Sequence, residues 1–248
     1  MKKLLTTTLA AGLVAGVATA EVSTTFDFAS AYVFRGVTYN DGAVFQPGIE
    51  ASGLGVPEAW GGVTIGAWGN YDIGDYDNTL ASSEFSEVDW YLSYSLPTFV
   101  EGLDLFAGYT EYTYPGALGG ADKEGNVGVG YEVIGIGLGY TLYFNVGSGE
   151  KYYYNEFVAS YGYDFTEELA ASVYGSAAYL TSDAPGQKDG FADGSLGADV
   201  SYALNDVWGI GASVTYIAQL DDEVLADGKY GTGYDVDLVG MLSLGASF

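Results

Sequence analysis

Strict alternation of apolar residues with small or polar residues constrains the fold of this chain more than any other feature. In segment 134–145, Ile, Leu, Tyr and Phe occupy every second position, and Gly, Thr, Tyr or Asn lie between them. Segment 234–248 repeats the pattern up to Phe248. A period of two is typical of an extended strand whose two faces meet different surroundings. The chain is therefore predicted to be all-β.

The same alternation, broken by turns rich in Gly, Asp, Asn or Pro, predicts about twelve strands. They are expected at 22–35, 43–53, 61–71, 86–96, 103–113, 126–133, 134–146, 152–164, 168–180, 194–204, 207–219 and 233–248. From the third link onward, longer and shorter connections alternate along the chain. This asymmetry is typical of an up-and-down meander with one elaborated end and one trimmed end.

The residues at the polar positions favour a membrane barrel over a soluble one. These positions hold mostly Gly, Ser, Ala and Thr, and the whole chain has only 7 Lys and Arg against 33 Asp and Glu. A soluble sandwich or barrel would turn its apolar face inward and cover its exterior with charged residues. The sequence thus predicts a transmembrane antiparallel β-barrel of the outer-membrane type, with lipid on the apolar face and small or polar residues toward the lumen.

The first twenty residues have the features of a secretory signal peptide. Lys2 and Lys3 precede an apolar stretch, and Ala18-Thr19-Ala20 resembles a cleavage site before Glu21. We therefore expect a cleaved signal over 1–20, a single barrel domain over 21–248, and export to a bacterial outer membrane.

Arg35, the only arginine, is expected to face the lumen together with Asp27 on one strand, and Glu50 on the next strand is expected to approach it. We favour a buried ion pair over a selectivity or gating contact, because a buried charge is normally paired. The other carboxylates chosen as lumen and selectivity candidates are Glu87, Asp89, Glu132, Glu156 and Asp199. With so few positive charges, the lumen is predicted to favour cations or neutral solutes.

Composition excludes several classes of function. There is no Cys and no His, so disulfides, thiolate metal sites and the His-dependent chemistry of barrel hydrolases are ruled out. The acidic chain would repel nucleic acid, and no motif predicts a cofactor. The function expected is a porin-like channel for passive diffusion of small solutes. The alternatives are a non-conducting structural or adhesin-type barrel and, less favoured, an outer-membrane enzyme.

One segment resembles a known family. Ser30-Ala-Tyr-Val-Phe-Arg-Gly-Val-Thr38, followed by Asp41-Gly42 and Gln46-Pro-Gly-Ile-Glu50, is similar to the opening hairpin of the TorF family of porin-like proteins. Ala31 replaces an expected small acidic residue, and Pro47 interrupts the return strand. The resemblance covers about twenty residues and implies a barrel and a pore, without a substrate.

Two further expectations concern assembly and the width of the bore. An aromatic residue that closes an alternating strand, here Phe248, resembles the signal read by the outer-membrane assembly machinery, so lipid and that machinery are the expected partners. The openness of the bore depends on how far six aromatic side chains reach inward: Trp68, Tyr91, Phe106, Tyr143, Tyr154 and Tyr174.

Overall fold

The computed structural model describes residues 21–54, 60–74, 83–116, 120–225 and 236–248, which form twelve long strands and one short hairpin. The signal peptide expected over 1–20 lies outside the described residues. No helix in the described ranges is long and apolar enough to cross a membrane. The long strands are β1 (Glu21–Ala29), β4 (Val44–Ser52), β5 (Gly62–Asp72), β6 (Glu84–Leu96), β7 (Leu103–Thr113), β8 (Asp122–Val133), β9 (Ile136–Asn145), β10 (Tyr152–Asp164), β11 (Leu169–Ser182), β12 (Gly190–Ala203), β13 (Trp208–Gln219) and β14 (Leu238–Ser247).

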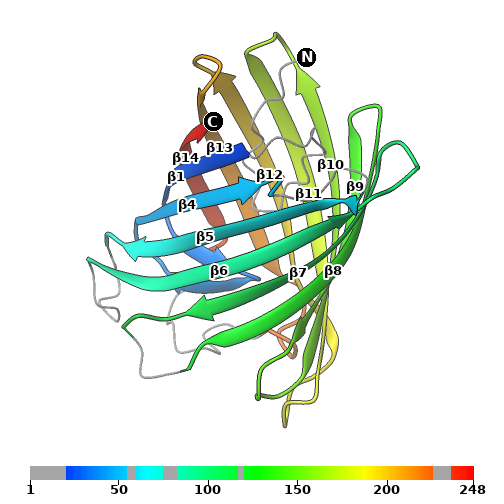
Figure 1. Cartoon of the computed structure of the whole chain (residues 1–248). Coiled ribbons are helices and arrows are strands. Elements are labelled where there is room, and N and C mark those ends of the chain that lie inside the picture. Colours follow the sequence, from blue (N-terminus) through cyan, green and yellow to red (C-terminus); the bar gives the residue numbers. More distant parts are fainter. Residues whose placement is uncertain (1–20, 55–59, 75–82, 117–119, 226–235) are drawn as a thin grey trace.

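These twelve strands close into one antiparallel barrel (Figure 1). Each strand pairs with its neighbours in the chain, and β1 completes the ring by pairing with both β4 and β14. The closing seam runs from Ser23 opposite Ser247 to Ala29 opposite Met241. A closed ring leaves no unpaired strand edge, which is the condition for a sheet that faces lipid. The predicted architecture and strand number are confirmed.

The two faces of the wall differ as the alternation predicts. On β12, Leu196, Val200 and Tyr202 on the outer face are 68%, 43% and 46% exposed, whereas Gly197 and Asp199 between them face the lumen. The other strands have the same arrangement, with large apolar side chains exposed on the outside and most buried polar side chains inside. This is the arrangement of an outer-membrane-type barrel, in which lipid covers the apolar belt.

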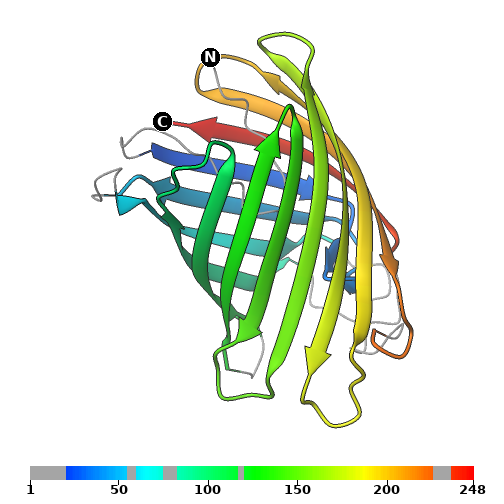
Figure 2. The same ribbon diagram turned by 90° about the vertical axis from the view of Figure 1, so that its right-hand side faces the viewer.

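The connections differ between the two ends of the barrel, and Figure 2 shows the longer ones at its lower end. The elaborated end carries the links 30–43, 73–83, 114–121, 146–151, 183–189 and 220–237. The trimmed end carries 53–61, 97–102, 134–135, 165–168 and 204–207. The predicted alternation of longer and shorter links is therefore confirmed for most of the chain.

The predicted first strand, 22–35, is wrong beyond Ala29. The chain leaves the wall there and forms a hairpin of β2 (Tyr32–Phe34) and β3 (Val37–Asn40) that pairs only with itself. The turn lies at Arg35 and Gly36, whose φ angles of 51° and 75° are both positive. Two central residues with positive φ form the type of turn whose twist matches paired strands. The alternation thus continues through a reversal of chain direction, which is why the sequence suggested one long strand.

This hairpin, which we call the plug, extends from the elaborated end into the barrel. Its tip residue Arg35 contacts Glu124 on β8, and four strands separate β8 from β1 along the shorter way around the wall. Nearer its base, Tyr32 packs against Trp68 of β5, with ring centroids 5.6 Å apart. The plug therefore crosses the lumen and contacts the wall on both sides.

Candidate functional site

The tip of the plug is held by a bidentate ion pair. Arg35 Nη1 and Nη2 donate to Glu124 Oε2 and Oε1 over 2.7 and 2.9 Å. Two parallel N–H···O bonds between a guanidinium and a carboxylate form the strongest common geometry for such a pair. Glu124 is fully buried, and it also accepts hydrogen bonds from Tyr152 at 2.7 Å and Tyr112 at 3.0 Å. Four hydrogen bonds therefore surround one carboxylate.

Aromatic rings enclose the same guanidinium. The Arg35 Cζ atom lies 4.3 Å from the ring centroid of Tyr154, 4.5 Å from that of Tyr143 and 4.8 Å from that of Phe34. A cation held over aromatic faces at such distances is attracted by their negative electrostatic potential. Tyr143 and Tyr154 belong to the wall strands β9 and β10, whereas Phe34 belongs to the plug.

The charge of Arg35 is secured by these surroundings. Burial by itself would lower the pKa of the guanidinium, but the charge of Glu124 and its hydrogen bonds raise that pKa well above its usual range. In the plug strand β2, burial raises the pKa of Tyr32 well above normal, and the charge of Glu87 raises it further. Arg35 is thus a permanent cation at the tip, and Tyr32 is a neutral hydrogen-bond donor nearer the base.

Side chains make the remaining polar contacts of the plug with the wall. The Tyr32 hydroxyl donates to Glu87 Oε2 at 2.8 Å, Asn40 Nδ2 donates to Asp72 Oδ1 at 2.6 Å, and Gln219 Nε2 donates to the Gly36 carbonyl at 2.9 Å. Beside the tip, a small apolar cluster contains the buried residues Tyr154, Ala178, Ala192, Val224 and Leu225. Val37 of the plug packs against this cluster.

The predicted neighbours of Arg35 are wrong. Asp27 lies on β1, opposite Ser243 in the closing seam, and Arg35 lies on the separate plug. Glu50 accepts a hydrogen bond from the Tyr91 hydroxyl at 3.1 Å. The expectation assumed a straight strand through position 35, whereas the hairpin carries Arg35 across the lumen.

The remaining candidate carboxylates are spread along the wall. Glu87 and Asp89 are both buried, two residues apart on the lumen face of β6. Glu156 lies on the lumen face of β10, and Asp199 of β12 accepts a hydrogen bond from Ser172. Glu132 is exposed near the trimmed end.

Three carboxylates that contact the plug were not among the candidates: Glu124, Asp72, which accepts the hydrogen bond from Asn40, and Asp193, whose side chain lies beside Gly36. Glu124 fell within a predicted link, because β8 begins at Asp122 and not near residue 126. Asp193, which accepts a hydrogen bond from the Tyr154 hydroxyl at 2.8 Å, lay just before the predicted strand 194–204. Positions 123 and 125, on the same outward face of β8 as Val127, hold Lys and Gly instead of apolar residues, so the alternation gave no signal for a strand there.

Three of the six aromatic side chains that were expected to limit the width of the bore lie flat against the wall. Tyr91, Phe106 and Tyr174 each pair directly with a glycine on the neighbouring strand: Gly66, Gly128 and Gly197. A Cβ atom at those glycines would lie only 2.2, 2.1 and 2.2 Å from the ring atoms, so each ring occupies the space that a side chain would fill. These rings do not reach across the lumen. Trp68, Tyr143 and Tyr154 instead contact the plug or its tip.

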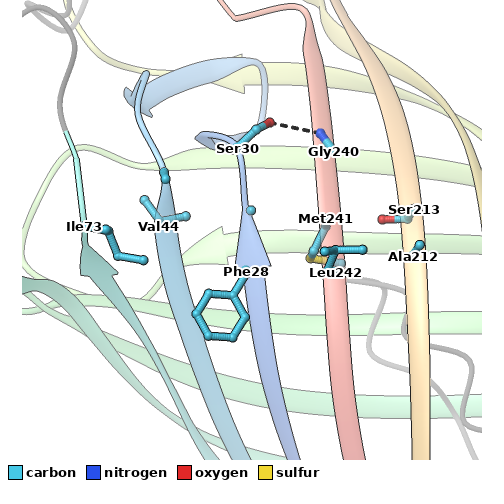
Figure 3. Close-up of a pocket in the computed structure, with 11 residues that line it drawn as sticks. Phe28, Ser30, Val44, Ile73, Ala212, Ser213, Gly240, Met241 and Leu242 are labelled. Carbon is cyan, nitrogen blue, oxygen red and sulfur yellow. Dashed lines mark hydrogen bonds between the residues drawn. The ribbon is translucent and has the colours of Figure 1, made fainter.

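A pocket of about 390 Å³ lies in the wall where β1 ends, and Figure 3 shows it beside the hydrogen bond between Ser30 and Gly240. Its lining includes Phe28 and Leu242, which are exposed on the outer face, and Val44, which is fully buried. None of the described residues that line it is charged. It is therefore separate from the charged site at the plug. Among the described residues, no group of three or more acidic side chains could hold a metal ion.

No protein-family model and no curated protein matches the sequence, so the resemblance to the TorF family stays a prediction. Solved structures that share the fold include two porins and an outer-membrane channel. The NanC porin has a TM-score of 0.54 at 8% identity, covering 92% of this chain and 98% of that one. An outer-membrane channel from Pseudomonas putida F1 has a TM-score of 0.53 at 7% identity, covering 92% and 95%. The KdgM porin has a TM-score of 0.50 at 7% identity, covering 92% and 99%.

Proposed function

We propose that the protein is an outer-membrane channel for passive diffusion of small solutes, and that its lumen favours cations. The observation that carries this proposal is the pairing of Arg35 with Glu124, which uses the only arginine of the chain to neutralise one carboxylate. The other carboxylates on the lumen face have no described arginine to pair with. A lumen lined by carboxylates attracts cations and repels anions. The fold shared with porins and an outer-membrane channel supports the barrel part of the proposal.

Single-channel recording in a planar bilayer under a salt gradient tests both parts. The reversal potential is expected to have the sign of a cation-selective pore. The double substitution Glu87→Gln and Asp89→Asn is expected to shift it toward zero, because it removes two buried lumen carboxylates. Glu111→Gln is the matched control, because Glu111 pairs with Lys123 on the outer face and its loss is expected to leave the potential unchanged. A reversal potential of the opposite sign in the unmodified protein would contradict the proposed selectivity.

One observation favours the alternative of a non-conducting structural barrel. The plug crosses the lumen and contacts opposite sides of the wall, so it occupies space that solutes would need. A folded, inserted sample that passes no current under any applied voltage would support this alternative and overturn the channel. We propose no catalytic activity, since the chain has neither His nor Cys. Lipid and the outer-membrane assembly machinery are proposed as its partners, and the outer membrane as its location.

A further inference from the structure

The wall residues around Arg35 form a receptor for a guanidinium group. Glu124 supplies two oxygens at 2.7 and 2.9 Å, and the rings of Tyr143 and Tyr154 lie 4.5 and 4.3 Å from the guanidinium carbon. We call these three side chains the wall site. Only Phe34, the third ring, belongs to the plug. Both oxygens and two of the three rings that contact the cation therefore come from the barrel and would remain if the plug moved away.

The wall site is held in shape without Arg35. Tyr112 and Tyr152 each donate a hydrogen bond to Glu124, and the Tyr154 hydroxyl donates to Asp193 at 2.8 Å. The Tyr143 and Tyr154 rings also contact each other, with centroids 6.1 Å apart. A binding site whose side chains are already fixed loses little conformational entropy when a ligand arrives.

A solute could replace the contacts that hold the plug in place. Among the described residues, no backbone–backbone hydrogen bond joins segment 32–40 to a barrel strand. The plug is held by side-chain hydrogen bonds and packing, and its tip by the ion pair. A buried carboxylate left alone is strongly unfavourable. Displacement of Arg35 would therefore need another cation on Glu124.

From this arrangement we infer that the wall site binds small solutes that carry a guanidinium group, in competition with Arg35. This inference rests on the proposed channel, whose acidic lumen would concentrate cations near the site. The flat shape and paired N–H groups of a guanidinium match two carboxylate oxygens and two aromatic faces. A primary ammonium has no planar fork and cannot reproduce the bidentate pair, so it should bind more weakly.

The experiment removes Arg35 from the wall site and measures whether a small guanidinium compound binds there instead. Arg35→Ala removes the resident cation, and ethylguanidinium chloride is the probe, with ethylammonium chloride as the matched cation. Binding is read from the thermal unfolding midpoint of the folded protein in detergent, which does not depend on conductance. Ethylguanidinium at millimolar concentration is expected to raise the midpoint of Arg35→Ala, with roughly tenfold tighter binding than ethylammonium, because one charge-assisted hydrogen bond is lost. The double variant Arg35→Ala/Glu124→Gln should show no such rise.

Current measurements on the same samples separate this inference from the channel itself. If Arg35→Ala conducts, ethylguanidinium is expected to reduce its current saturably, and ethylammonium much less. A rise in midpoint without any current would uphold the site and reject the channel. A conducting Arg35→Ala variant whose midpoint does not rise and whose current is not blocked by ethylguanidinium would reject the site but not the channel. The site would also be rejected if both cations raised the midpoint equally, or if ethylguanidinium raised the midpoint of the double variant Arg35→Ala/Glu124→Gln as much as that of Arg35→Ala. If Arg35→Ala does not fold, the unmodified protein is measured instead. A saturable increase in its current with ethylguanidinium would support displacement of the plug by the solute, and an unchanged current would reject the inferred site.

Discussion

Glu124 is the carboxylate on which the tip of the plug depends. It is fully buried, and it accepts two hydrogen bonds from Arg35 and one each from Tyr112 and Tyr152. The guanidinium of Arg35 has no other described carboxylate as an ion-pair partner. Loss of the charge at Glu124 would therefore leave a largely buried cation without compensation, which is the most unfavourable way to break such a pair.

Glu124→Gln is accordingly expected to lower the free energy of unfolding by about 3 kcal/mol. The plug should also leave its position for part of the time, so the single-channel conductance is expected to rise. Unfolding in urea, followed by tyrosine and tryptophan fluorescence of detergent-folded protein, measures the first effect. Glu132→Gln on the same strand and the same face is the control, because Glu132 is exposed. Equal stability of the two variants would show that the pair contributes nothing measurable.

The sequence predicted that Arg35 needs a partner but not which one. A lone buried arginine must be paired, and the acidic composition offered many carboxylates. The choice of Asp27 and Glu50 followed from a strand assumed to be straight. The true partner lies 89 positions along the chain from Arg35. Only the turn at Arg35 and Gly36 brings the two together, and Arg-Gly is not among the dipeptides that mark such turns most strongly.

Pairs of strands are locked together by an aromatic ring lying over a glycine. Tyr91 of β6 lies over Gly66 of β5 and reaches Glu50 of β4, where its hydroxyl donates a hydrogen bond at 3.1 Å. Tyr174 of β11 lies over Gly197 of β12 and reaches Thr215 of β13, with 2.7 Å between the hydroxyl oxygens. Each ring thus links three neighbouring strands and keeps the bore clear beside the wall.

Gly66→Ala is expected to destabilise the barrel by about 1–3 kcal/mol, the usual effect of an added methyl group in a packed place. Its Cβ would lie 2.2 Å from the Tyr91 ring, so the ring must turn into the lumen. The conductance should fall for the same reason. Gly62→Ala on the same strand and face is the control, because nothing lies within 4 Å of its Cβ. In the double variant Gly66→Ala/Tyr91→Ala the lost conductance should return; a conductance unchanged in Gly66→Ala would contradict the role of the glycine.

At the level of elements, the long strands were predictable and the plug was not. Alternation identifies every barrel strand, since each spans a lipid-facing belt that requires apolar side chains at every second position. The predicted strands 126–133 and 134–146 follow each other directly, and the structure places a two-residue turn between them, in which Ile134 and Gly135 have φ angles of 52° and 75°. Plug residues also alternate, but both faces of the hairpin meet protein or lumen. Their pattern therefore does not reveal that the hairpin lies inside the wall.

For the whole molecule, closure depends on the seam between β1 and β14. Beyond the end of β14, the backbone N–H of Phe248 donates to the Val22 carbonyl at 2.9 Å, and the Val22 N–H donates to the Phe248 carbonyl at 3.3 Å. The Phe248 side chain is 68% exposed and shares the outward parity of Leu242 and Leu244 on β14. Its backbone therefore extends the seam, while its ring is free for lipid or for the assembly machinery proposed above.

Two variants separate these roles of Phe248. Phe248→Ala keeps both backbone hydrogen bonds and removes the ring, whereas deletion of the residue removes both. If the ring is read during assembly, both variants should reach the outer membrane in reduced amounts, although Phe248→Ala should refold into detergent as well as the unmodified chain. Leu242→Ala is the matched control, because Leu242 is 64% exposed on the outer face of the same strand. The measurement is the folded, heat-modifiable fraction in isolated outer membranes. A defect confined to the deletion would assign the effect to the seam, and normal amounts of both variants would contradict any role of Phe248 in assembly.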